Sequence, residues 1–593
     1  MSKKPAQSRA DLRGDPLGRW PRRLLHVPTM ISYEWSPGNK YGKHYAPEYN
    51  AITYTWGRWR LNPTERPDVR SISVSGVHWD IPRVHPDRFT TNELEQLIRT
   101  ATKAQPMFAH LGSNPSSSCD FVWLDIVCID QRDGSPTAAS EIGRQALIFD
   151  GAKQVVVWLN TFTTHSLNRF IHELFRATEK LEEKEENRAA LDDSVSRALL
   201  RHLQKSFDQI FSDPWFSSLW TLQEAYLRSD AVLASREGCI AEGPAYGGTL
   251  KSHANLYDLI GFCEPLINSR FIKEQAPSHE YNSIRKLIEK SGLQALAEDS
   301  ALATYIAAAS RNFTKPSDAI YGIQQIFDAR VGVTAPGADH RKAWSLDQLE
   351  IQLGSHLLRQ HPVLSQMHVY TTPADLGSAW RVSKTRSIIP PDQRFVAYTT
   401  TRAAREHDPE NPLELSMCSL LVERAKETVW CRFNGPWCAF AEFRRISMQL
   451  SEHDILKDKM RESNLVTIYL DVTPELAKCP DYHSGGYTMV PQGSRQNACS
   501  LWLAKAFSPD TLRVLLLGRR GRSRNSAEPR VLVGLLLLRC RGEGPGLPSL
   551  YYRRIGFCVW STADLTIGGE YLPNAKLMTG LAPLWSKGVG IFG

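Results

Sequence analysis

Three short blocks decide the fold predicted for the first half of the chain. They are Tyr49-Asn-Ala-Ile-Thr-Tyr-Thr-Trp56-Gly57, Val122-Trp-Leu-Asp125-Ile-Val-Cys128-Ile-Asp130-Gln131 and Pro214-Trp-Phe-Ser-Ser-Leu-Trp220-Thr-Leu-Gln223-Glu224-Ala225. The first two each have the form of a buried strand that ends in polar residues or Gly. The third places aromatic side chains around a carboxylate, Glu224. Because open α/β sheets build sites where apolar strands deliver polar groups at their ends, the blocks predict both a sheet and a site.

The segments around these blocks predict an α/β fold with a parallel sheet and flanking helices. Buried strands are expected over residues 52–56, 121–129 and 154–159, because continuous apolar runs are typical of strands covered on both faces. Residues 71–79 alternate apolar and polar side chains and predict a further strand. Helices are expected over 91–103, with Asn92 as N-cap, and over 140–153, which gives a right-handed strand–helix–strand unit.

The rest of the chain changes texture along its length. Residues 166–211, 283–327 and 346–359 have helical periodicity. From residue 371 onward, short apolar runs are separated by Gly, Pro and Arg, which predicts strands in 465–470, 500–506, 512–517, 531–538 and 555–560. We therefore expect a disordered basic arm over 1–25, an α/β domain over 26–240, a helical extension over 250–360 and a β-rich C-terminal domain over 371–593.

Composition limits the classes of protein that fit. Eleven scattered Cys without a CxxC pair predict reduced thiols and a cytoplasmic location, and no His accompanies the closest pair, Cys431 and Cys438, so no metal site is expected. The N-terminal residues lack the apolar core of a signal peptide, and the longest apolar run, 531–538, is far shorter than the ~20 residues of a membrane helix. The net charge of +8 is modest, and the basic cluster 519–524 is expected to be a solvated loop, so neither nucleic acid nor a membrane is an expected partner.

The three blocks together resemble the fungal heterokaryon-incompatibility (HET) domain. The resemblance covers residues 49–225, with a weaker tail to about 327, and Asn160 and Ser218 depart from it where family members often have Gly and Arg. The matching residues are Tyr49, Ala51, Thr53, Tyr54, Trp56, Gly57, Trp123, Asp125, Cys128, Ile129, Asp130, Gln131, Glu141, Gln145, Ala152, residues 156–159, residues 214–224, Arg311, Asp318, Tyr321 and Gly322.

The resemblance implies a role in nonself recognition and programmed cell death in filamentous fungi. The HET domain is itself similar to the Toll/interleukin-1 receptor (TIR) domain, which implies a flavodoxin-like parallel sheet for residues 26–240. Some TIR domains cleave NAD with a Glu in a Ser-x-Trp-x-x-x-Glu element, and Ser218, Trp220 and Glu224 stand at that spacing. NAD is then a substrate, and no cofactor is expected.

Cleavage of the nicotinamide–ribose bond passes through an oxocarbenium-like state, which one carboxylate near the ribose can stabilise. Glu224 is the predicted catalytic residue. The predicted substrate-binding residues, all in the three blocks, are Trp56, Gly57, Asp125, Asp130, Gln131, Ser218 and Trp220. Structural roles stay open for several of them: Asp125 can tie down a loop, Asp130 and Gln131 can cap a helix, and Glu224 can pair within a packed helix. Cys128 is expected to be a buried, inert thiol.

Two functions therefore remain open. In the first, the protein is a death-inducing signalling module that hydrolyses NAD. In the second, it is a non-catalytic interaction module or scaffold of the same pathway that binds protein partners or further copies of itself. Ser218 in place of Arg favours the second, and the Ser-x-Trp-x-x-x-Glu spacing favours the first. For either function, we expect Trp56, Asp125, Asp130, Trp220 and Glu224 to meet at one edge of the sheet.

Overall fold

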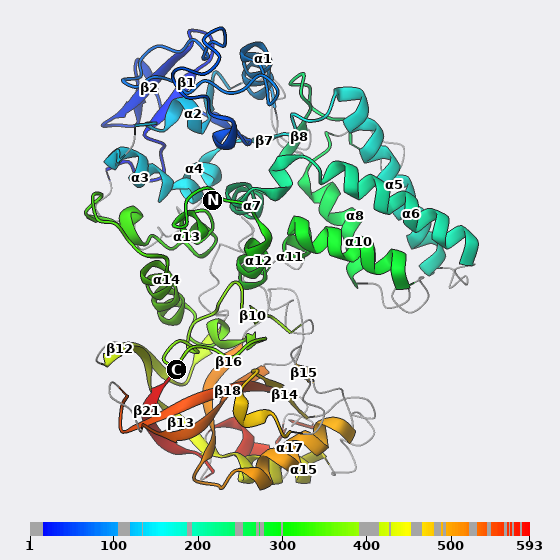
Figure 1. The fold of residues 1–593 in the computed structure, drawn as a ribbon, viewed down its shortest axis with the longest axis vertical. Coiled ribbons are helices and arrows are strands. Elements are labelled where there is room, and N and C mark those ends of the chain that lie inside the picture. Colours follow the sequence, from blue (N-terminus) through cyan, green and yellow to red (C-terminus); the bar gives the residue numbers. More distant parts are fainter. Residues whose placement is uncertain are drawn as a thin grey trace. The chain divides into compact units, whose positions relative to one another are not determined.

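In the computed structural model the chain forms two compact units (Figure 1). Unit 1 contains the described residues up to 297 together with 307–349, and unit 2 contains 300–306 and the described residues from 350 onward, so the predicted extension 250–360 contributes to both. The structure describes residues 16–104, 119–132, 134–186, 193–243, 253–268, 272, 278–297, 300–390, 414–425, 428–451, 465–479, 488–489, 494–520, 531–542, 547–561, 566–567, 570–571, 575–580 and 584–593.

A mixed sheet of eight strands forms the centre of unit 1. Its strands are β1 (Arg23–His26), β2 (Ile31–Ser36), β3 (Lys40–Tyr41), β4 (His44–Tyr45), β5 (Tyr49–Thr53), β6 (Phe121–Trp123), β7 (Val155–Trp158) and β8 (Val232–Ala234). They lie in the order β4–β3–β2–β1–β6–β5–β7–β8. The neighbours β6, β5, β7 and β8 are parallel, with Ala51 opposite Trp123 on one side and Val155 on the other. The predicted parallel relation of the three strands is therefore confirmed.

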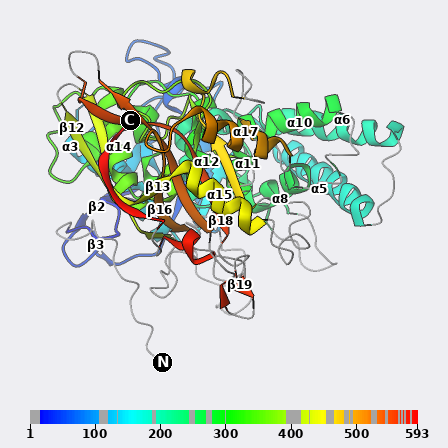
Figure 2. The same cartoon turned by 90° about the horizontal axis from the view of Figure 1, so that it is seen from below.

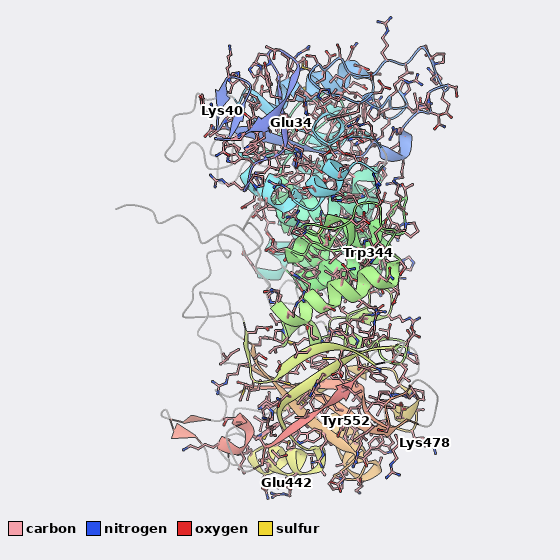
Figure 3. All side chains as sticks on the ribbon, turned by 90° about the vertical axis from the view of Figure 1, so that its left-hand side faces the viewer. Glu34, Lys40, Trp344, Glu442, Lys478 and Tyr552 are labelled. Atoms are coloured by element: carbon pink, nitrogen blue, oxygen red, sulfur yellow. The ribbon has the colours of Figure 1, made fainter. Side chains whose placement is uncertain are left out.

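The sheet is mixed because β1 to β4 are antiparallel, which the sequence did not predict. Leu24 and Leu25 of β1 are fully buried between β2 and β6, so the predicted arm 1–25 is too long at its C-terminal end. Residues 1–15 lie outside the described part. On β2, Glu34 pairs with Arg23 of β1 at 3.1 Å, and Figure 3 shows Glu34 beside the segment that carries Lys40.

Three predicted strands differ from the structure. β5 ends at Thr53, so Trp56 lies beyond the strand, next to the 3-10 turn η2 (Gly57–Trp59). β6 ends at Trp123, and the rest of the apolar run forms the helical turn α2 (Asp125–Cys128). The side-chain amide of Gln131 donates to the backbone carbonyls of Asp125 and Ile129 and so stabilises the end of this turn. Residues 71–79 form no strand and make only a single bridge, between Ser75 and Ile31.

Helices cover both faces of the parallel strands. Tyr49 and Asn50 are neighbours on β5 and therefore point to opposite faces. The Asn50 amide donates to the carbonyls of Ala101 and Ala104 at the end of α1 (Thr91–Ala101), whereas the Tyr49 hydroxyl donates to Ile148 of α4 (Gln145–Gly151). α1 thus lies on one face of the sheet and α4 on the other.

The predicted helix 140–153 is two helices, α3 (Pro136–Ile142) and α4. They are separated at Gly143, where an added Cβ would lie 2.8 Å from the Thr334 carbonyl oxygen, so the backbone needs a glycine there. The remaining helical elements of unit 1 are α5 (Thr164–Glu186), α6 (Asp193–Ile210), η4 (Pro214–Ser217), α7 (Leu219–Leu227), α8 (Leu256–Asn268), α10 (Ser278–Ser291), α11 (Leu293–Ala297), η6 (Ala308–Ser310), α13 (Asp318–Tyr321), η7 (Gln324–Phe327) and η8 (Gly332–Thr334).

Unit 2 is rich in strands, as predicted. Helix α14 (Leu346–Gln360) runs into it from unit 1. Its strands are β9 (Val369–Tyr370), β10 (Ser387–Ile388), β11 (Glu414–Ser416), β12 (Ser419–Ala425), β13 (Thr428–Ala439), β14 (Val466–Leu470), β15 (Thr488–Met489), β16 (Leu512–Arg520), β17 (Val531–Arg541), β18 (Leu550–Ser561), β19 (Thr566–Ile567), β20 (Glu570–Tyr571) and β21 (Ser586–Phe592). Its helical elements are α12 (Ala301–Ala307), η9 (Leu364–Gln366), α15 (Phe440–Ser451), η11 (Pro474–Leu476), α17 (Ser494–Ala506) and η12 (Ala575–Thr579).

The pairings in unit 2 form a closed circuit through β13, β16, β17, β18 and β21. Helices α15 and α17 pack beside it and share one hydrophobic core with its strands (Figure 2). Four of the strands predicted after residue 371 are confirmed as β14, β16, β17 and β18, but residues 500–506 belong to α17. In that helix Cys499 and Leu503 are buried four residues apart, which places both on one helical face.

The N-terminus of α1 offers a test of local stability. Thr90, and not the predicted Asn92, is the N-cap: its hydroxyl accepts from the Glu93 amide while the Glu93 carboxylate accepts from the Thr90 amide. We predict that Thr90→Ala destabilises α1 by about 1 kcal/mol, because this reciprocal cap is lost. Amide hydrogen exchange within α1 measures the loss, and Thr91→Ala, which removes an exposed hydroxyl contact to Arg70, is the control. Equal effects of the two substitutions would contradict the assignment of the cap.

Candidate functional site

Polar side chains follow three neighbouring parallel strands at the point where each strand ends. Asp125 comes two residues after β6, Thr53 is the last residue of β5, and Asn160 comes two residues after β7. In chain order the four parallel strands lie 2-1-3-4, so the direction of winding reverses at β5. The crevice outside the carboxyl ends of strands at such a reversal is where open α/β sheets bind ligands.

Glu224 reaches this edge from helix α7. The Thr53 hydroxyl donates to its Oε2 atom, and the same hydroxyl accepts from the Trp215 indole nitrogen at 2.9 Å. Thr53 and Tyr49 lie four residues apart on β5, so their side chains point to the same face of the sheet, the face that α4 covers. The end of β5 and the start of the third block, residues 214–225, are therefore joined through the Thr53 hydroxyl group.

Asp125 and Trp56 form the neighbouring contact. The Trp56 indole nitrogen donates to Asp125 Oδ2 at 2.7 Å, and the other carboxylate oxygen accepts from the Ile126 amide at 2.7 Å. The Trp56 contact crosses from β5 to the segment after β6, so it fixes the two strand ends against each other. Asp125 thus has its own partners and also lies at the predicted edge.

The two carboxyl groups affect each other electrostatically. Burial raises the pKa of Glu224 to about 8 against the opposing effect of the Thr53 hydrogen bond, and the charge of Asp125 raises it further. Burial also raises the pKa of Asp125, while the Trp56 hydrogen bond opposes the rise. Both residues are closely surrounded by protein but keep a partly exposed surface. At neutral pH the Glu224 carboxyl therefore holds its proton for most of the time and remains within reach of solvent.

A buried arginine positions the helix that carries Glu224. Arg311 donates to the carbonyls of Trp215 and Ser218, both at 3.1 Å, and to that of Ser291. Beside it, the Leu219 amide donates to the carbonyl of Asn312 at 3.1 Å. Arg311 and Asn312 therefore hold the start of α7 in place.

A chain of glutamines fixes the opposite side of α7. The side-chain nitrogen of Gln223 donates to the side-chain oxygen of Gln145 on α4 at 2.9 Å, and the side-chain oxygen of Gln223 accepts from the backbone amide of Gln325 at 2.9 Å. Gln223 is completely buried. Because Gln223 and Glu224 are neighbours on the helix, this anchoring also sets the direction of Glu224.

Of the five residues predicted to meet, three come together: Trp56, Asp125 and Glu224. Asp130 instead pairs with Arg132 at 2.7 Å and accepts from Ser135, and the Arg132 hydrogen bond lowers its pKa to about 2. The Trp220 side chain donates to Asp318, whose pKa burial raises.

The other predicted substrate-binding residues have mainly backbone roles. The Gln131 side chain closes α2, as described above. Ser218 is the N-cap of α7 without a capping side-chain bond, and its carbonyl accepts from Arg311. A Cβ on Gly57 would meet nothing within 4 Å, so neither sterics nor a close backbone approach requires glycine there.

Sequence reasoning missed the ion pair that supports the end of β5. Arg88 donates to the Thr55 carbonyl at 3.1 Å and lies 3.4 Å from Asp213, and both side chains are buried. Asp213 also accepts from the backbone amides of Trp215 at 2.8 Å and Thr161 at 3.0 Å. An Asp before Pro214, at the start of a helical turn, is the only sequence signal of this role.

Two further residues complete the description of the edge. Asn160 is fully buried, and neither polar atom of its side chain has a hydrogen-bond partner within the described part of the chain. The Cys128 thiol is buried, which raises its pKa to about 12, as expected for an inert thiol. No cluster of three or more His, Cys, Asp or Glu side chains suited to a metal ion occurs among the described residues.

Comparison with known proteins identifies a family for the segment that carries the sheet edge. Residues 49–224 match the family described as Heterokaryon incompatibility protein (HET). This HET segment begins at the first residue of β5 and ends at Glu224, so it contains all three residues that meet at the sheet edge. The chain matches no curated protein and no solved structure. In the part of the chain that the structure covers, no helix combines the length and apolar character needed to span a membrane.

Replacement of Arg311 tests how α7 is held in the HET segment. We predict that Arg311→Met lowers the free energy of unfolding of unit 1 by about 3 kcal/mol, because three carbonyl groups lose their donor in a buried place. Arg169→Met, at a half-exposed arginine of α5, is the control and should change stability little. Chemical denaturation measures both, and equal stability of the two variants would contradict the positioning role.

Replacement of Glu224 tests its proton affinity. The folded pKa of about 8 lies above the ordinary value of 4.5, so between these values the unfolded state loses its proton first and stability falls as pH rises. Gln has no proton to lose. We therefore predict that the melting temperature of Glu224→Gln, relative to that of the wild type, increases from about pH 5 to about pH 8. A difference that is independent of pH would contradict the raised pKa.

Proposed function

We propose that this protein acts in nonself recognition and programmed cell death of the heterokaryon-incompatibility type, and that its HET segment hydrolyses NAD at Glu224. The observation that carries the proposal is the carboxyl group of Glu224, a partly exposed residue, with its raised pKa, at the carboxyl edge of the parallel strands. Perturbed carboxyl groups at such edges are typical of catalytic sites. The match of residues 49–224 to the HET family supports the biological role.

The arrangement of the strands supports a TIR-like, flavodoxin-like fold as part of the proposal. The order 2-1-3-4 of the parallel strands is the beginning of the flavodoxin order, which binds its ligand beside the first and third strands. In this chain those strands are β5 and β7. Trp56 and Gly57 follow β5, and Asn160 follows β7, with a side-chain donor and acceptor that have no partner among the described residues.

Each residue has a defined task in the proposed reaction. Water attacks the ribose C1 atom as the bond to nicotinamide breaks, and nicotinamide, ADP-ribose and a proton are released. The ionised Glu224 carboxylate stabilises the positive charge that develops on the ribose. Asp125, held by Trp56, orients a ribose hydroxyl, and the open space at Gly57 receives the rest of the nucleotide.

The raised pKa of Glu224 gives the proposal a characteristic pH dependence. Only the ionised carboxylate stabilises a developing cation, and Glu224 ionises with a pKa of about 8. We therefore predict that kcat/KM for NAD increases with pH and levels off above about 8, because kcat/KM reports the groups of the free enzyme. A rate that is constant between about pH 6 and pH 9 would contradict this role of Glu224.

The direct test is the release of nicotinamide from NAD by the purified full chain. We predict that Glu224→Gln lowers kcat by about 100-fold or more, as expected when the charge that stabilises a transition state is lost. Glu179→Gln, at an exposed position of α5, is the matched control and should retain activity. Activity that survives in a folded Glu224→Gln protein refutes the catalytic role. Wild-type protein that releases no nicotinamide, even when oligomerised, supports the non-catalytic interaction module instead.

A further inference from the structure

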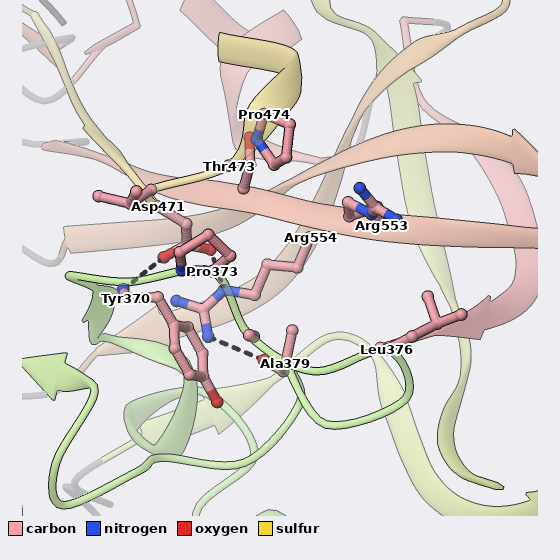
Figure 4. Close-up of a pocket in the computed structure, with 12 residues that line it drawn as sticks. Tyr370, Pro373, Leu376, Ala379, Asp471, Thr473, Pro474, Arg553 and Arg554 are labelled. Carbon is pink, nitrogen blue, oxygen red and sulfur yellow. Dashed lines mark hydrogen bonds and ion pairs between the residues drawn. The ribbon is translucent and has the colours of Figure 1, made fainter. Parts of the chain in front are cut away.

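Unit 2 contains a cavity that the proposed function does not use. It has a volume of about 200 Å³ and lies between the segment that follows β9, the segment that follows β14, and strand β18 (Figure 4). Pro373, Leu376 and Pro474 contribute apolar surface, and Tyr370, Thr473, Arg553 and Arg554 contribute polar groups. Pockets that hold drug-sized ligands measure about 300–1,000 Å³, so this cavity suits a smaller molecule.

Arg554 forms a rigid wall of the cavity. Its side chain is fully buried, lies 3.3 Å from Asp471 and donates to the carbonyls of Gln366, His368 and Ala379. Figure 4 shows the guanidinium group between Asp471 and Ala379, beside the Tyr370 ring. Its charge is balanced by Asp471, and both of its terminal nitrogens donate to the protein. Arg554 therefore shapes the cavity in advance and leaves ligand binding to other groups.

Arg553 differs from Arg554 in its exposure and its partners. Its side chain is 29% exposed, and one terminal nitrogen pairs with Glu475, which is 26% exposed and does not line the cavity. A guanidinium group has five N–H donors in a planar fork. Arg553 can therefore keep Glu475 on its outer side and still present donors to the cavity.

From this arrangement we propose that the cavity binds a small organic anion, with a compact apolar body and one carboxylate. The apolar body packs between Leu376 and Pro474, which line the cavity. The carboxylate pairs with Arg553, because a planar fork of donors matches a carboxylate in two parallel hydrogen bonds. Asp471 is the one acidic side chain among the described lining residues, and Arg554 already engages it, whereas Glu475, the partner of Arg553, lies outside the lining; Arg553 is therefore the lining cation left to meet an anion.

The test uses benzoate as the anionic probe and benzamide as its neutral counterpart, with the full chain and isothermal titration calorimetry. We expect benzoate to bind about tenfold or more tightly than benzamide, because only benzoate makes charged hydrogen bonds to the arginine. Arg553→Gln should weaken benzoate binding by a similar factor, and Arg553→Lys by less. Leu376→Trp should block both probes by filling the cavity.

The matched control is Arg445→Gln, which breaks the exposed Arg445–Glu442 pair on α15, with 2.6 Å between its charged atoms. It should bind benzoate as the wild type does. Equal binding of the two probes, unchanged binding in Arg553→Gln, or no binding of benzoate at millimolar concentration would each overturn the proposal. The inference is independent of NAD hydrolysis, so Glu224→Gln should bind benzoate normally whether or not the wild type releases nicotinamide.

Discussion

The hydrogen bond from Thr53 to Glu224 is the contact on which the candidate site depends. It joins the last residue of the central parallel strand to the helix that ends the HET segment, two positions separated by 171 residues. Thr53 also accepts from Trp215, so one hydroxyl fixes both the Glu224 carboxyl group and the Trp215 indole ring. The link lies where β5 runs between β6 and β7, at the edge where three strand ends meet.

The surroundings of this contact show a conflict between stability and chemistry. Burial raises the pKa of Glu224, and an ionised carboxylate in that place is costly. Among the described residues, the side chains that perturb the Glu224 carboxyl are Thr53 and Asp125, and neither is a cation. Two buried arginines of unit 1 have other partners: Arg311 holds the start of α7, and Arg88 holds Thr55 and Asp213. A carboxyl group that is firmly positioned without a paired cation supports the proposed catalytic role.

The sequence predicted the parallel strands and the approach of Glu224 to Asp125 and Trp56, because apolar runs and their polar ends have a local signature. It failed where an apolar run lacked periodicity. Residues 125–128 form a helical turn whose Asp125 carbonyl accepts from the Ile129 amide and the Gln131 side chain, and residues 500–506 belong to a helix whose Cys499 and Leu503 face one core. The roles of Thr53, Arg88 and Arg311 could not be predicted, because each depends on a partner 96 to 171 residues away.

The protonation state of Glu224 is the most direct test of this account. Infrared difference spectra of the wild type against Glu224→Gln, recorded across a pH titration, isolate the carboxyl band of this one residue. We predict a protonated carboxyl band that persists at neutral pH and disappears with a midpoint near pH 8. A band that disappears near the ordinary value of 4.5 would contradict this prediction, because the surrounding protein would then not shift the pKa of Glu224.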